Sequence, residues 1–260
     1  MKIRNKISNQ STRKCITILD NQTFSLVESY KSLRTNILFS LPAKENGCRK
    51  ILLTSANPGD GKTTTSVNMA ITLAQANIRV LIIDADMRKP TVHKYFGIES
   101  RVGLSNALSG MNKLDECIQT VKKTENLWVI PSGILPPNPS ELLSSKNMTQ
   151  LIETLETRFD FIIIDTPPVN IVTDALAVSK LVDGVAVVCA QNVTRYPDLK
   201  RAVASLEFAD ANILGFVLNK VHKSKSKYGK NYSYSYRYKY KSPKSEDGVV
   251  SPGGLDTLVK

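Results

Sequence analysis

The chain has 260 residues, of which 42% are hydrophobic, and a formal net charge of +12. This hydrophobic fraction supports a sizeable core, and the scattered spacing of its four cysteines excludes a disulfide framework and a zinc site. The sequence contains no apolar run of about 18 residues and no apolar stretch after its first basic residues, so we expect neither a membrane span nor a signal peptide.

The positive charge is concentrated at the two ends of the sequence. Residues 1–22 hold five basic residues and one acidic residue, and residues 223–260 hold nine basic and three acidic residues. The two segments therefore carry +4 and +6, which leaves +2 for the centre. We predict a flexible basic arm over 1–22, one folded domain over 23–222, and a disordered basic tail rich in tyrosine over 223–260.

The first predicted element is a helix over residues 24–40. Apolar residues recur there at the spacing of one helix face. A polar connector follows, from Ala43 to Arg49.

Next comes the stretch around which the chain is organised, a P-loop over residues 56–63. It lies between an apolar strand, 51–55, and a predicted helix, 64–74. Glycines let the backbone N–H groups of such a loop converge on phosphate, the lysine reaches the β- and γ-phosphates, and the threonine hydroxyl suits Mg²⁺. Ala56 replaces the usual first glycine, at a position that closes the turn without contacting phosphate. The residues of this loop with a predicted task in phosphate or magnesium binding are Gly59, Gly61, Lys62 and Thr63.

Beyond the P-loop, apolar strands alternate with helices as far as residue 219. This pattern predicts an α/β fold of the P-loop NTPase type, with a mostly parallel central sheet and helices on both faces. Further strands are expected at 79–84, 127–130, 161–165, 184–189 and 214–219, and helices at 140–157, 172–181 and 197–208. Ser140 is a candidate cap for the first of these helices.

Polar residues end three of the strands, where ligands of parallel sheets bind. Asp84 and Asp86 follow one strand, Asp165 ends another and Asn219 ends the last. Two carboxylates facing a P-loop are what a nucleotide–Mg²⁺ site requires.

Several motifs together resemble the bacterial tyrosine kinases of capsule and exopolysaccharide synthesis, which are P-loop proteins unrelated to eukaryotic kinases. The stretch 82–88 resembles the extra acidic motif of that family, known as A-prime, and 161–168 resembles its Walker B strand. The stretch 28–37 is similar to its N-terminal oligomerisation helix, and 136–143 to its characteristic turn and helix. The C-terminal tyrosine cluster is similar too, with Tyr228, Tyr232, Tyr234, Tyr236, Tyr238 and Tyr240.

The resemblance implies an ATP-dependent protein-tyrosine kinase that uses Mg²⁺. It implies catalytic roles for Lys62, Asp84 and Asp86, and metal binding by Thr63, Asp84 and Asp165. It also implies that the phosphates are wrapped by Gly59, Asp60, Gly61, Lys62, Thr63 and Thr64. Either Asp84 or Asp86 could accept the tyrosine proton, although a loose transition state needs little help from a base. Asn219 resembles an adenine contact of related ATPases, with a strand-end cap as the alternative.

The resemblance also implies assembly and regulation. The tyrosine cluster would be autophosphorylated in trans within a ring-like homo-oligomer held by Glu28, Lys31 and Arg34. Lys31 replaces the usual arginine of that motif, which keeps the charge and loses the bidentate fork. The chain resembles the stand-alone members of the family. These are cytoplasmic, are recruited to the inner face of the membrane by a transmembrane adaptor, regulate polysaccharide synthesis and export, and phosphorylate other proteins on tyrosine.

Two other functions are alternatives for a chain with a P-loop. Partitioning or septum-positioning ATPase switches carry a signature lysine five residues before the P-loop lysine, where this chain has Asn57. A nucleic-acid-binding ATPase would use the interleaved tyrosines and lysines of the tail, but single-strand binders stack bases on a rigid aromatic platform, and the tail lacks an apolar face to build one. We therefore expect no nucleic-acid partner.

Overall fold

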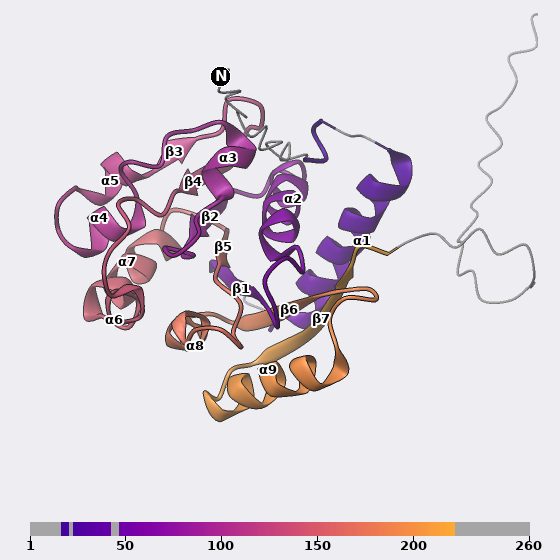
Figure 1. Ribbon diagram of the computed structural model, residues 1–260. Helices are drawn as coiled ribbons and strands as arrows, with labels where there is room; N and C mark the ends of the chain where they lie inside the picture. The colour runs from indigo at the N-terminus through magenta and orange to yellow at the C-terminus, as the bar shows by residue number, and fades with distance from the viewer. Residues whose placement is uncertain (1–16, 21–22, 43–46, 222–260) are drawn as a thin grey trace, which may run out of the picture. The chain divides into compact units, whose positions relative to one another are not determined.

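A seven-stranded sheet runs through the part of the chain that the computed structural model describes, residues 17–20, 23–42 and 47–221 (Figure 1). The strand order is β3-β4-β2-β5-β1-β6-β7, and all pairings are parallel except that of β3 with β4. The strands are β1 (Arg49–Ser55), β2 (Val80–Asp84), β3 (Gln119–Thr120), β4 (Leu127–Ile130), β5 (Phe161–Asp165), β6 (Gly184–Ala190) and β7 (Ile213–Asn219).

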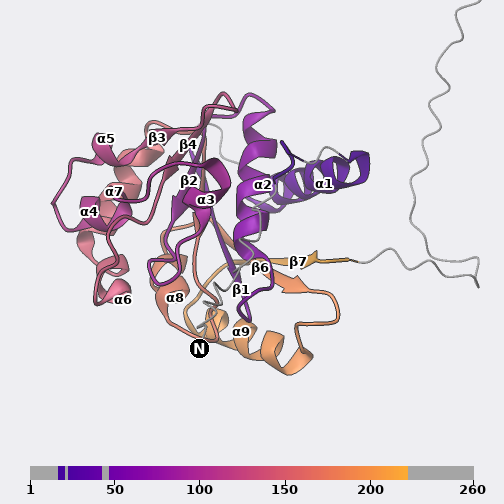
Figure 2. The same ribbon diagram turned by 45° about the horizontal axis from the view of Figure 1, so that its top comes forward.

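Helices cover both faces of this sheet, as expected for a parallel sheet whose central strands, β2 and β5, are buried throughout (Figures 1 and 2). One apolar core joins the sheet to α1, α2 and α3, and the other joins it to α4 through α9. The first group comprises α1 (Phe24–Ser40), α2 (Lys62–Ala74) and α3 (Val92–Phe96). The second comprises α4 (Leu104–Leu108), α5 (Leu114–Cys117), α6 (Pro139–Leu143), α7 (Lys146–Glu156), α8 (Asp174–Ser179) and α9 (Tyr196–Phe208).

The topology brings the predicted site residues to one edge of the sheet. Strand β1 lies between β5 and β6, and its carboxyl end leads into the P-loop. Strand β5 also pairs with β2 in a register that places Asp84 directly beside Asp165. The predicted α/β fold with a mostly parallel sheet is confirmed.

Some predicted elements need correction. The helix expected over 140–157 is two helices, because the chain turns at Ser144 and Ser145, and the Ser145 hydroxyl caps α7 by accepting from the Met148 N–H. Ser140, the expected cap, lies inside α6 instead. Strand β3 was not predicted, since two residues carry no alternation pattern. The ends predicted for α8 were too wide, because the helix covers only Asp174–Ser179.

Within these described ranges, no helix is long and apolar enough to cross a lipid bilayer. Most of the predicted basic arm and the whole tyrosine-rich tail lie outside the described residues.

Candidate functional site

The P-loop is built on two glycines whose backbone lies in the left-handed region. Gly59 has φ +86° and Gly61 has φ +99°, and Gly61 precedes the first residue of α2. A Cβ atom at Gly61 would lie 1.9 Å from the side-chain nitrogen of Asn219, so a side chain there would displace Asn219. The loop thus directs the N-terminus of a 13-residue helix at the space where an anion would bind.

Asp60 stabilises this loop from within. Its carboxylate accepts hydrogen bonds from the Asn57 N–H at 3.0 Å and from the Thr194 hydroxyl at 2.8 Å. The Asn57 amide in turn donates to Asp198 at 3.1 Å. Any contribution of Asp60 to phosphate binding therefore falls to its backbone. Thr64, at the start of α2, lies with its hydroxyl 2.6 Å from that of Tyr95.

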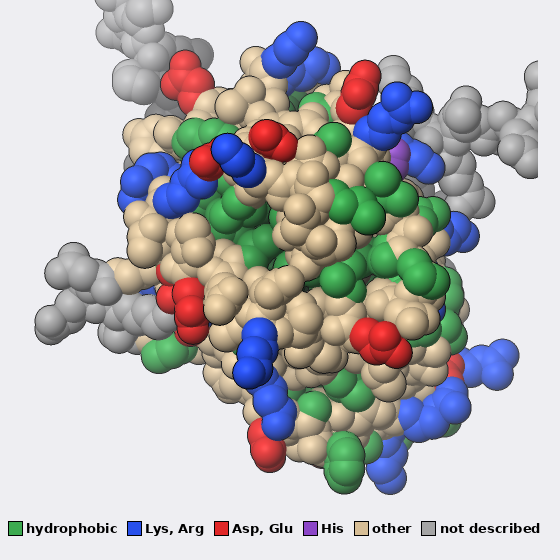
Figure 3. Space-filling model, turned by 90° about the vertical axis from the view of Figure 1, so that its left-hand side faces the viewer, with side chains coloured by type: hydrophobic (Ala, Val, Ile, Leu, Met, Phe, Trp, Pro, Cys, Tyr) green, Lys and Arg blue, Asp and Glu red, His purple; other side chains and the backbone are tan. Residues whose placement is uncertain are grey.

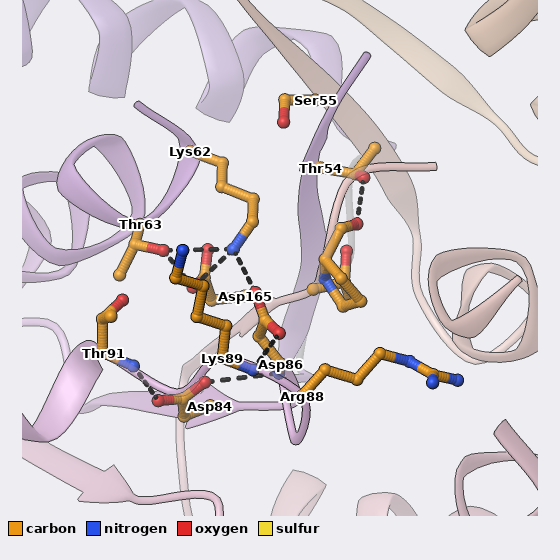
Figure 4. A network of polar contacts seen from close by, with 12 residues as sticks. Thr54, Ser55, Lys62, Thr63, Asp84, Asp86, Arg88, Lys89, Thr91 and Asp165 are labelled. Carbon is orange, nitrogen blue, oxygen red and sulfur yellow. Dashed lines mark hydrogen bonds and ion pairs between the residues drawn. The ribbon is translucent and has the colours of Figure 1, made fainter. Parts of the chain in front are cut away.

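Lys62 lies at the centre of a buried acidic cluster (Figure 4). Its ammonium group is 2.9 Å from a carboxylate oxygen of Asp86 and 3.5 Å from one of Asp165. The Thr63 hydroxyl donates to that same oxygen of Asp165 at 2.7 Å. The structure therefore brings together four predicted residues from the P-loop, the end of β5 and the loop after β2. Sequence reasoning missed a fifth, Ser66, whose hydroxyl donates to the second oxygen of Asp165 at 2.9 Å.

Burial and mutual charge control the protonation of this cluster. Burial, and then the charge of Asp165, raises the pKa of Asp84 to about 8. Burial also raises the pKa of Asp165, against the opposing effect of Lys62. Burial by itself lowers the pKa of Lys62, but the charges of Asp165 and Asp86 outweigh it, so the net pKa is raised and the lysine stays cationic.

Asp84 holds the backbone of the acidic loop. One of its oxygens accepts from the N–H groups of Thr91 and Val92 at 3.1 and 3.0 Å, and the other accepts from the Asp86 N–H at 3.3 Å. Asp86 accepts from the Lys89 N–H at 3.0 Å. The geometry thus gives Asp84 a supporting task, with Asp86 as the carboxylate that reaches Lys62.

The donor set fits a magnesium ion that is bound together with phosphate. The Thr63 hydroxyl and the Asp165 carboxylate are hard oxygen donors that already converge on one point. No group of three or more histidine, cysteine or acidic side chains that could hold a metal occurs among the described residues. Mg²⁺ commonly takes one or two carboxylates and completes its shell with phosphate and water, so this small donor set suffices.

A second polar network, partly buried, lies behind the acidic loop, and sequence reasoning did not find it. Arg88 donates two hydrogen bonds to the carboxylate of Asp174, at 2.9 and 3.0 Å. Ser140, at the start of α6, donates to the same carboxylate and accepts from Arg88 at 3.1 Å. Arg88 belongs to the A-prime stretch that the sequence singled out, but no sequence signal identifies Asp174 as its partner.

The three residues predicted to hold an oligomer lie on α1. Glu28 and Lys31 form an ion pair of 2.8 Å within the helix. Arg34 donates to the backbone carbonyl of Thr72 on α2 at 2.9 Å, so it joins α1 to the P-loop helix. Tyr30 strengthens this attachment through its hydroxyl, which accepts from the Asn68 amide at 3.2 Å.

Asn219 lies against the P-loop. Its amide donates to the carbonyl oxygen of Asp60 at 3.0 Å, and the side chain of Lys220 donates to that of Gly59. Asn219 therefore lies beside the P-loop. This position is compatible with both predicted roles, a contact to adenine and a strand-end cap. The six predicted acceptor tyrosines, from 228 to 240, lie outside the described residues.

Comparison with known proteins gives a consistent result. The family described as AAA domain matches residues 48–194. The putative tyrosine-protein kinase CapB of Staphylococcus aureus is 37% identical over 221 residues, which cover 84% of this chain and 96% of CapB. The kinase domain of the Escherichia coli tyrosine kinase ETK has a similar structure, with a TM-score of 0.75, 36% identity and 84% of each chain covered.

Two further solved structures are similar to this chain, and one of them is a septum site-determining protein. The chimerical protein CapA2B2 matches with a TM-score of 0.74 and 37% identity, over 79% of this chain and 89% of its own. The septum site-determining protein MinD of Pyrococcus horikoshii, complexed with Mg-ADP, matches with a TM-score of 0.59 and 25% identity, over 68% of this chain and 72% of its own. The likeness to an ATPase switch is thus the weaker of the two.

Proposed function

This chain belongs to the bacterial tyrosine-protein kinases of the capsule family, and on that premise we propose that Lys62 and its surrounding carboxylates transfer the γ-phosphoryl group of ATP to tyrosines of the chain's own C-terminal segment. The observation that carries the proposal is the convergence of Lys62, Asp86, Asp165 and Thr63 at the mouth of the P-loop.

Lys62 acts on the phosphoryl group that is transferred. Before nucleotide binds, its ammonium group pairs with Asp86 and Asp165. Phosphate oxygens then replace Asp86 as its partner, and the positive charge stabilises the charge that the phosphoryl oxygens carry in the transition state. Asp86, released from Lys62, becomes available to the incoming hydroxyl.

Asp86 is accordingly the residue we assign to orient the tyrosine hydroxyl and to receive its proton. Asp84 is fully buried, and both of its oxygens are already bonded to the backbone of the loop. We assign Asp84 to holding Asp86 in place.

Thr63 and Asp165 are the residues we assign to Mg²⁺, with Ser66 fixing the orientation of the carboxylate. When bound, the ion neutralises charge on the β- and γ-phosphates. Asn219 is proposed to contact the adenine base from the end of β7.

The proposed acceptors are the six tyrosines between residues 228 and 240, presented by one copy to another within a ring-like oligomer. Each added phosphate brings about −1.5 to −2 charges, so modification of all six tyrosines would reverse the +6 charge of residues 223–260 and weaken their attraction to an acidic site. The relative solved as the chimera CapA2B2 supports, by its two-part name, the further proposal that the chain works with a transmembrane adaptor at the inner face of the membrane. In that setting it would regulate capsule or exopolysaccharide synthesis and phosphorylate other proteins.

The test is incubation of the full chain with MgATP, followed by mass spectrometry of the C-terminal segment. We expect phosphotyrosine in the wild type and a loss of at least about 100-fold in the Lys62→Met variant. Lys200→Met, on the exposed side of α9, is a matched control that should retain activity. Near-normal autophosphorylation by a folded Lys62→Met protein would reject the assignment of the site.

A further inference from the structure

A groove of about 450 Å³ lies between α4, α6 and the loop that follows β4. Met111, Ile134 and Leu135 line it with 69%, 56% and 57% of their surfaces exposed. Figure 3 shows the face that carries α4 and α6, with hydrophobic side chains gathered over its middle. Large apolar side chains that gather at one hollow, instead of lying scattered, mark a binding surface.

The loop that presents these side chains is held firmly. Two backbone hydrogen bonds join it to α4, from the Leu104 N–H to the carbonyl of Pro131 at 2.7 Å and from the Ser105 N–H to that of Ser132 at 2.9 Å. The Ser105 hydroxyl donates to the carbonyl of Ile134 at 2.6 Å. A preformed surface of this kind has little ordering entropy to lose when it binds a partner.

Gly133 shows how closely the loop is packed. Its φ is +82°, and a Cβ atom there would lie 2.3 Å from the side-chain oxygen of Asn106. That oxygen also accepts from the N–H of Ile134 at 3.3 Å. The exposed positions of Ile134 and Leu135 therefore follow from the backbone geometry.

The groove is connected to the catalytic loop. Its α6 wall is hydrogen-bonded to Arg88 through Ser140, and Arg88 is two residues from Asp86. A second hollow of about 570 Å³ shares Ile134 and Leu135 with the groove and extends to Pro90, which follows the acidic loop. A chain lying across both hollows would reach Pro90, which is four residues beyond Asp86 in the sequence.

We propose that this groove binds the tyrosine segment of a second copy of the chain, residues 232–240, and so acts as the docking surface for the phosphate acceptor. The inference rests on the proposed function and names the surface that recognises its substrate. Tyrosine occupies every second position of the segment, with Ser233, Ser235, Arg237 and Lys239 between them. Bound in an extended form, such a segment turns its tyrosine rings to one side and its polar and cationic side chains to the other.

The groove lining suits residues 232–240 in both charge and polarity. Glu141 is the charged residue among the described residues that line the groove. Its negative charge complements residues 232–240, which include two cations and no acidic residue. Tyrosine rings pair an apolar body with a polar tip, which suits an apolar groove whose rim carries serine and asparagine.

Chain length limits how far the segment can reach within one copy. Eleven residue-to-residue steps lead from Val221 to Tyr232, and fully extended they span at most about 40 Å. Four strands lie between β7 and β4, which puts these two strands about 24 Å apart through the sheet, and a path around the surface is longer. A neighbouring copy imposes no such limit.

The experiment measures phosphorylation of a synthetic peptide, residues 228–242, by the full chain at varied peptide and ATP concentrations. We expect Leu135→Asp to raise the KM for the peptide about tenfold without changing the KM for ATP, and Glu141→Gln to raise the peptide KM about twofold to threefold. Phe208→Asp, at a position 91% exposed on α9, is the matched control and should change neither constant. A control peptide has the same composition but places its tyrosines consecutively. We expect the wild type to have a higher KM for this control than for the native peptide, and we expect Leu135→Asp not to raise that KM further.

Two results would overturn the inference while leaving the proposed function intact. The first is a peptide KM that stays within twofold of wild type in Leu135→Asp. The second is an altered sedimentation profile in Leu135→Asp together with an unchanged peptide KM. That result would indicate that the groove contacts a different segment of a second copy. A wild-type chain that phosphorylates neither the peptide nor its own tail would reject the proposed function itself, and the docking surface with it.

Discussion

Arg88 and Asp174, 86 residues apart in the sequence, share two hydrogen bonds of 2.9 and 3.0 Å. The Asp174 side chain is completely buried, whereas 41% of the Arg88 side chain is exposed. The pair joins the loop that carries Asp86 to the start of α8, and Ser140 joins both to α6. The position of Asp86 thus depends on contacts made two residues further along the chain.

Removing the guanidinium should therefore affect both stability and catalysis. In Arg88→Ala the buried carboxylate of Asp174 loses two donors and keeps Ser140, so we expect a loss of about 1–3 kcal/mol in the free energy of unfolding, measured by urea titration. We also expect a reduced kcat with little change in the KM for ATP, because Asp86 loses its restraint. Arg88→Lys keeps the charge without the fork and should recover part of each effect. If kcat is unchanged in Arg88→Ala, the pair does not position Asp86.

The high pKa of Asp84 predicts a pH-dependent gain in stability from Asp84→Asn. The folded chain raises this pKa from 3.8 to about 8 through burial and the charge of Asp165, so the carboxylate destabilises the fold progressively as pH rises from about 4 to 8. The asparagine removes this effect, and each pKa unit relieved is worth about 1.4 kcal/mol, or roughly 3–6 °C in Tm.

Differential scanning fluorimetry without nucleotide measures this gain. The difference in Tm between Asp84→Asn and wild type should be small near pH 4, grow up to about pH 8 and then level off. Asp115→Asn, at a 79% exposed side chain, controls for general charge effects. A Tm difference that is constant across this pH range would contradict the assignment.

Asp165→Asn should separate magnesium binding from nucleotide binding. The amide oxygen can still accept from Thr63, but the charge that attracts the ion is lost. We expect kcat with MgATP to fall by at least about 100-fold, while calorimetry without magnesium shows ATP affinity within a few-fold of wild type. Thr63→Ser keeps the hydroxyl and serves as the control. An unchanged magnesium dependence in Asp165→Asn would rule out its role as a ligand.

The α1 residues predict separable effects on stability and assembly. Arg34→Ala removes a bond to the Thr72 carbonyl, so we expect a loss of about 1 kcal/mol in stability together with weaker self-association and slower autophosphorylation. Glu28→Ala breaks an exposed pair within the helix and should weaken self-association without a measurable loss of stability. Light scattering that gives the same mass for wild type and both variants would reject α1 as an interface.

The elements that the sequence predicted best are those with a long local pattern. Helix α1 begins and ends at the predicted residues, Phe24 and Ser40, because 17 residues of helical periodicity define both ends. The apolar strands were found because a parallel sheet buries both of their faces. Asp84 and Asp165 were predicted to face the P-loop, because ligand sites lie at the carboxyl ends of parallel strands, and the two do pair in register.

What the sequence missed depends on contacts between distant segments or on choices among equivalent residues. Ser140 and Ser145 have the same capping chemistry, and nothing local reveals that Ser140 is engaged by Asp174 while Ser145 starts α7. The partnership of Arg88 with Asp174 arises because the sheet brings the ends of β2 and β5 together. The sequence also did not predict that Ile134 and Leu135 are exposed, because two adjacent apolar residues are typical of a buried core.

The last strand is attached to the P-loop by the loop's carbonyl groups. Asn219 and Lys220 donate to the carbonyls of Asp60 and Gly59, whereas the N–H groups of the same loop are the expected ligands of phosphate. One side of each peptide unit thus faces the proposed phosphate site, and the other anchors the strand that leads to the proposed acceptor segment. A change in loop conformation during turnover therefore reaches Val221 through two hydrogen bonds, without first passing through either hydrophobic core.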